Sequence, residues 1–137
     1  MSAAQDFKLF LQEHEIDFTE LHKQESTTYY SSYRFDDSGI TVEIAFHFDT
    51  KDLFAECGIF EFGRLDNSLT SYQLLNNVNA TYKVGKFFRM DDGTVVAKTT
   101  RCLSDLGLDC QAFFNDFGVL LNIVEEVAKE IVKSKWS

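Results

Sequence analysis

The sequence predicts an α+β protein, an antiparallel sheet with helices packed mainly on one face, in the order α-β-β-β-α-β-β-α. Apolar residues recur at helical spacing near both ends of the chain and in its middle. Apolar and polar residues alternate from Ile40 to Asp49, and short turns such as Asp-Asp-Gly connect strand-like segments directly. Strands joined by short turns pair antiparallel, because a parallel pair needs a long crossover. We expect one domain over residues 1–137.

Each of the three expected helices begins at a polar cap. Ser2 and Gln5 form a capping box at the first helix, Asn67 or Ser68 caps the second, and Asp109 caps the third. The expected bounds are Ala3 to about His14, Leu69 to about Val78, and Asp109 to about Lys133.

Five strands are expected, over Tyr29–Phe35, Ile40–Phe48, Leu53–Phe62, Tyr82–Met90 and Thr94–Leu103. The alternation of Ile40–Phe48 predicts one face toward the core and one toward water. Leu53–Phe62 is apolar on both faces, and its Gly58 suggests a bulge. Ile16–Leu21 fits either a short strand or an extended connector, and the sequence leaves both open.

Charge and cysteine content exclude several classes of function. With 13 Lys and Arg against 22 Asp and Glu, the formal net charge is −9, which disfavours binding to nucleic acid or to an anionic membrane surface. The three cysteines have no CxxC spacing, and no apolar run is long enough for a signal peptide or a membrane span. We therefore expect a cytoplasmic protein.

No catalytic, cofactor or metal constellation is found. The three histidines lack metal-ligand spacing with one another or with a cysteine. Cys110 follows the cap Asp109 and would lie at a helix N-terminus, but no base accompanies it. The sequence predicts a protein that is not an enzyme and has no cofactor.

Asn76, Asn77 and Asn79 lie at the end of the second expected helix. Asparagine tolerates left-handed geometry and bonds to loose backbone groups. We expect Asn79 to end the helix and Asn76 or Asn77 to hold the neighbouring backbone. The alternative is that these amides recognise a ligand.

The stretch "LLNNVNATYKVGKFFRMDDGTVVAKTTRCL", residues 74–103, is similar to the helix-to-hairpin segment of the YbjN family. Asn76, Asn79 and Lys83 or Lys86 occupy the positions of that family's pattern. The resemblance implies a type III secretion chaperone-like fold, frequent homodimers, no known catalysis and the general description of a sensory transduction regulator.

Apolar residues are in excess of what one sheet face needs. We expect Ile59, Phe60, Phe62 and Phe87 to form an uncovered strip that binds a partner. The alternative is that a helix or a loop covers them.

Two functions follow from these observations. The first is a non-enzymatic protein- or peptide-binding module, a chaperone-like or regulatory adaptor that forms homodimers. The alternative is an acidic decoy that occupies the basic surface of a nucleic-acid-binding protein.

Overall fold

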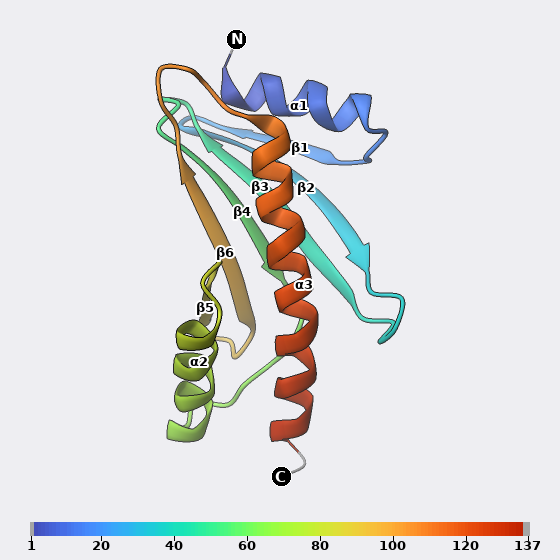
Figure 1. The fold of residues 1–137 in the computed structure, drawn as a ribbon, viewed down its shortest axis with the longest axis vertical. Helices are drawn as coiled ribbons and strands as arrows, with labels where there is room; N and C mark the ends of the chain where they lie inside the picture. Colours follow the sequence, from blue (N-terminus) through green and yellow to red (C-terminus); the bar gives the residue numbers. More distant parts are fainter. Residues whose placement is uncertain (1, 136–137) are drawn as a thin grey trace.

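The computed structural model describes residues 2–135, which form three helices and one six-stranded antiparallel sheet (Figure 1). The elements are α1 (Ala3–Glu13), β1 (Thr19–Lys23), β2 (Ser26–Arg34), β3 (Thr41–Asp49), β4 (Phe54–Phe60), α2 (Leu69–Thr81), β5 (Lys86–Arg89), β6 (Val95–Cys102) and α3 (Cys110–Ser134). The strand order across the sheet is β1-β2-β3-β4-β6-β5. The predicted α+β class is confirmed.

The segment that the sequence left open contains a strand. Thr19–Lys23 pairs antiparallel with β2, so four strands, not three, precede α2. Four of the five residues of β1 are exposed, and a strand that is exposed on both faces carries no strong alternation. β1, the strand that the sequence did not predict, therefore has almost no signal in the sequence.

Two of the three predicted caps are confirmed, and for the third the structure decides between the two candidate residues. The capping box of Ser2 and Gln5 is formed at α1, and the Asp109 carboxylate accepts a hydrogen bond from the Ala112 N–H at 3.0 Å. Ser68, rather than Asn67, caps α2. These are local interactions between residues three apart, which explains why sequence spacing predicts them.

All three helices pack against one face of the sheet, the face predicted from Ile40–Phe48 (Figure 1). On α1, Phe7 lies with its ring 4.9 Å from Phe46 and 5.1 Å from Phe113 of α3. Leu75 and Val78 of α2 join the same core. In the described part of the chain, no helix covers the other face, which we call the open face.

Candidate functional site

Three of the four residues expected in a partner-binding strip lie in the core. Ile59, Phe62 and Phe87 are at most 3% exposed, and the rings of Phe62 and Phe87 pack edge to face at 6.2 Å. The helices cover these side chains because Ile59 and Phe87 both face Ala97 of β6, on the core side of the sheet. Phe60 alone lies on the open face, half-buried. The structure does not bring the four together as a surface.

Small, aromatic and charged side chains lie next to one another across the strands of the open face. Strand pairing places Tyr30 beside Ala45, Ala45 beside Gly58, and Gly58 beside Lys98. Tyr30 is 39% exposed, whereas Ala45 is 8% exposed. A line of small residues between longer ones makes a shallow depression at the middle of the sheet.

This depression has a volume of about 220 Å³. Its lining residues come from β2, β3, β4 and β6: Thr28, Tyr30, Ala45, His47, Glu56, Gly58, Phe60 and Lys98. Gly58 does not form the predicted bulge, since its pairing with Ala45 and Lys98 is continuous. Its role is steric: a Cβ there would lie 2.9 Å from the Phe60 ring. The missing side chain lets that ring lie over the strand.

A small polar network fixes the charged side chains of the open face. Glu56 accepts a hydrogen bond from the Thr100 hydroxyl at 3.1 Å and lies 3.4 Å from the Lys98 ammonium. The same ammonium lies 5.8 Å from the centre of the Phe88 ring, a cation–π distance. His47 Nδ1 is 2.7 Å from the Thr28 hydroxyl. Sequence reasoning missed this group because only strand order brings β4 and β6 together.

The asparagines at the end of α2 have a structural role that differs from the prediction. The helix continues to Thr81, so Asn79 does not end it. The Asn79 side chain accepts a hydrogen bond from the Phe87 N–H at 2.8 Å and donates one to the Phe87 carbonyl at 2.9 Å. Asn76 and Asn77 lie exposed on the helix surface. Asn79 thus closes the outer edge of β5.

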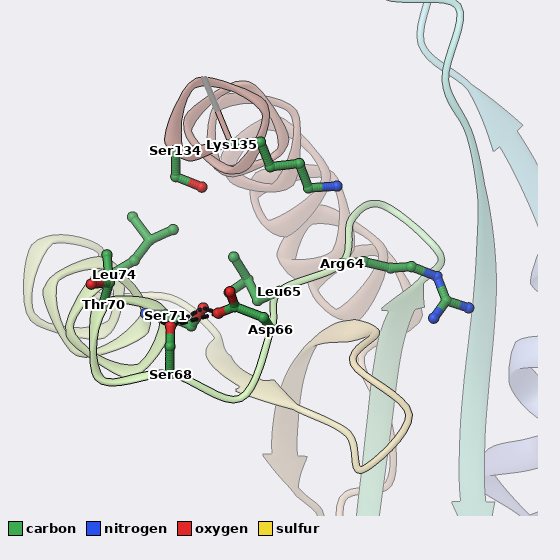
Figure 2. A pocket seen from close by; sticks show the side chains of 9 residues that line it. All are labelled: Arg64, Leu65, Asp66, Ser68, Thr70, Ser71, Leu74, Ser134 and Lys135. Carbon is green, nitrogen blue, oxygen red and sulfur yellow. Dashed lines mark hydrogen bonds between the residues drawn. The ribbon is translucent and has the colours of Figure 1, made fainter. Parts of the chain in front are cut away.

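A second hollow, about 440 Å³, lies between the start of α2 and the end of α3 (Figure 2). At its centre the Asp66 carboxylate accepts hydrogen bonds from the hydroxyls of Ser68 at 2.5 Å and Ser71 at 2.7 Å. These two hydroxyls hold the pKa of Asp66 below its ordinary value. Because Ser68 also caps α2, this network belongs to the start of the helix.

The thiols of Cys57 and Cys110 are poor nucleophiles because the pKa of each is raised. Burial raises the pKa of Cys57 to about 12. Burial and the nearby carboxylates of Asp6 and Asp109 raise the pKa of Cys110, against the lowering that a helix N-terminus alone would give. Among residues 2–135, no group of His, Cys, Asp and Glu side chains is arranged to hold a metal ion.

The described helices also give no membrane span: within residues 2–135, none combines the length and apolar character that a crossing requires.

The fold and its surface define a class of protein: an α+β module in which the described helices cover one face of the sheet and leave the other face uncovered. A family model described as "Putative bacterial sensory transduction regulator" matches residues 4–131, and the chain belongs to this family, YbjN. No curated protein and no solved structure matched the chain.

Proposed function

We propose that this chain is a non-enzymatic regulatory adaptor that holds a protein or peptide partner on the open face of its sheet, and that it acts as a homodimer. The observation that carries this proposal is the one-sided packing of the sheet. An uncovered sheet face with half-buried aromatic side chains resembles the centre of a protein interface, where aromatic residues are enriched. The family description as a regulator agrees with a binding role.

The shape of the face favours a macromolecular partner over a small substrate. Small-molecule sites are concave and enclose most of the ligand, whereas the depression on the open face is shallow and spreads over four strands. The fixed pairing of Lys98 with Glu56, beside the Phe60 and Phe88 rings, gives apolar contacts with a polar rim. We infer that such a surface binds a partner through contact area and complementary shape and does not carry out a reaction.

A salt-dependent pull-down compares two variants that change the total charge equally. Lys98→Glu reverses a charge on the open face, where the Lys98 ammonium lies 3.4 Å from Glu56, whereas Lys129→Glu reverses one on the exposed side of α3. We expect wild type and Lys129→Glu to retain the same partner at high salt and Lys98→Glu to lose at least about tenfold in retained partner. Circular dichroism checks that all three proteins are folded.

Two results contradict the proposal. Equal retention by Lys98→Glu and Lys129→Glu would show that the open face is not the binding surface. Recovery of basic nucleic-acid-binding proteins alone, all lost at high salt, would favour the acidic decoy, since screening removes long-range attraction between net charges and the chain carries a formal charge of −9.

A further inference from the structure

The two edges of the sheet are treated differently. At β5, the Asn79 amide bonds to both the N–H and the carbonyl of Phe87, as a neighbouring strand would. At the other edge lies β1, which pairs only with β2 in the described chain. The nearby helix α1 packs over the sheet face, with Phe7 against Phe46 and Phe48, rather than along the β1 edge. β1 is therefore an open edge.

An open edge strand presents backbone donors and acceptors to any chain that can lie beside it, because alternate residues direct N–H and C=O groups away from the existing neighbour. Thr19–Lys23 is exposed at four of its five residues, and Leu21 at its middle is 41% exposed. Native proteins protect such edges with charged side chains. In β1, the order of the charged residues decides which strand is able to pair with this edge.

The sequence of β1 is complementary to itself when two copies run antiparallel. In a twofold-symmetric pair the axis is perpendicular to the sheet and passes through one residue, because facing side chains must point to the same side. With the axis at Leu21, all five residues pair: Glu20 faces His22, Thr19 faces Lys23, and Leu21 faces itself. Each carboxylate then meets an imidazole, and the apolar side chains meet at the centre.

The neighbouring registers are worse. An axis at Glu20 sets two carboxylates opposite each other, and an axis at His22 sets two imidazoles opposite each other. The first pairs only residues 19–21 of the strand and the second only residues 21–23, and two carboxylates directly opposite each other destabilise a sheet. Glu20 is held ionised by the hydrogen bond from Lys8, which keeps its pKa below the ordinary value. That charge favours the Leu21-centred register.

We propose that two copies of this chain pair through β1, antiparallel and centred on Leu21, and join their sheets into one continuous sheet. This inference rests on the homodimer in the proposed function and names its interface. Because the axis is perpendicular to the sheet, the open faces of both copies lie on the same side. The dimer then presents a surface of twice the area, on which one long partner or two linked segments bind with increased avidity.

Charge exchange across the twofold axis tests this pairing, with sedimentation equilibrium as the measurement. His22→Glu places a carboxylate opposite Glu20 of the other copy, twice per dimer, and we expect the dimer dissociation constant to rise at least about tenfold. Exchanging the two side chains, Glu20→His together with His22→Glu, restores a carboxylate facing an imidazole and is expected to recover most of the loss. Lys86→Glu, at the closed β5 edge, is the matched control and leaves the dimer unchanged.

His22→Pro is a second test, because the N–H of His22 points away from β2 and proline lacks an N–H and obstructs that edge; it is expected to give a monomer with a normal circular dichroism spectrum. A dimer that persists in both His22→Glu and His22→Pro would overturn the β1 interface. A wild-type monomer over the whole concentration range would overturn it as well. If that monomer still loses its partner in Lys98→Glu, the open-face proposal stands although the edge pairing fails.

Discussion

At the scale of single residues, Asn79 gives the clearest case of a side chain that replaces a strand. Its amide offers one donor and one acceptor to Phe87, and both groups of that residue are used. The sequence placed three asparagines near this point but could not show which one faces β5. The answer depends on the rotation of α2, which its packing on the core through Leu75 and Val78 determines.

We expect Asn79→Ala to lower the free energy of unfolding by about 1–3 kcal/mol, because it leaves the N–H and the carbonyl of Phe87 without their partner. Asn76→Ala, on the exposed surface of the same helix, is the control and is expected to change stability by less than about 0.5 kcal/mol. Urea denaturation measures both. Equal effects would show that the two hydrogen bonds contribute nothing beyond helix propensity.

Asp49 is expected to make stability depend on pH. Burial alone raises the pKa of its carboxyl group, but the N–H groups of Phe54 and Leu53, at 2.9 and 3.0 Å, outweigh that effect and hold the pKa below the ordinary value. A lowered pKa means that the unfolded chain binds the proton more readily. The stabilisation is therefore complete above about pH 5 and is lost as the pH falls through the lowered value.

Asp49→Asn keeps an acceptor oxygen but does not titrate. We expect it to cost about 0.5–1 kcal/mol at pH 7, a modest value because the group is partly exposed. The difference from wild type should shrink as the pH falls from 5 to about 3. Urea denaturation across that range measures it, and a difference that stays constant with pH would contradict the role given to the Asp49 charge.

At the scale of elements, the sequence predicted the features that local interactions determine, such as the helix starts. The side chains of Ser2 and Asp109 accept hydrogen bonds from backbone N–H groups three residues further along the chain, so the spacing of each cap is visible in the sequence. The side on which Ile59, Phe62 and Phe87 lie was not predictable in the same way. It follows from the insertion of β6 between β4 and β5 and from the helices that cover that face. The charged group of Glu56 and Lys98 was missed for the same reason.

Two glycines in different elements are expected to respond to alanine with opposite signs. Gly118 lies within α3, and a Cβ there meets nothing within 4 Å, so Gly118→Ala should raise the free energy of unfolding by about 0.5–1 kcal/mol. Gly85 enters β5 with φ of 90°, and its Cβ would lie 2.5 Å from Leu120 Cδ1. Gly85→Ala should therefore destabilise by about 1–3 kcal/mol.

Thermal and urea denaturation of both variants check this pair of predictions. A stabilised Gly85→Ala variant would mean that the turn before β5 is able to adopt another backbone conformation. A destabilised Gly118→Ala variant would mean that the exposed side of α3 is in contact with something, for example another copy of the chain.

At the scale of the whole molecule, the chain has one covered sheet face, one open sheet face, one closed edge and one open edge. The covered face accounts for stability through an aromatic core that includes Phe7, Phe46 and Phe113. We infer that the open face binds the partner and that the open edge at β1 joins two copies. Each inferred role uses a surface that the others leave free.

The measurement that tests the central claim most directly is site-specific photo-crosslinking in native lysate. A crosslinking side chain replaces Tyr30, which is exposed on the open face, or Asn122, which is exposed on α3. We predict that a partner protein is captured from the Tyr30 position and not from the Asn122 position, and that Lys98→Glu abolishes the capture. Capture from Asn122 alone, or capture from Tyr30 that Lys98→Glu leaves unchanged, would contradict the account.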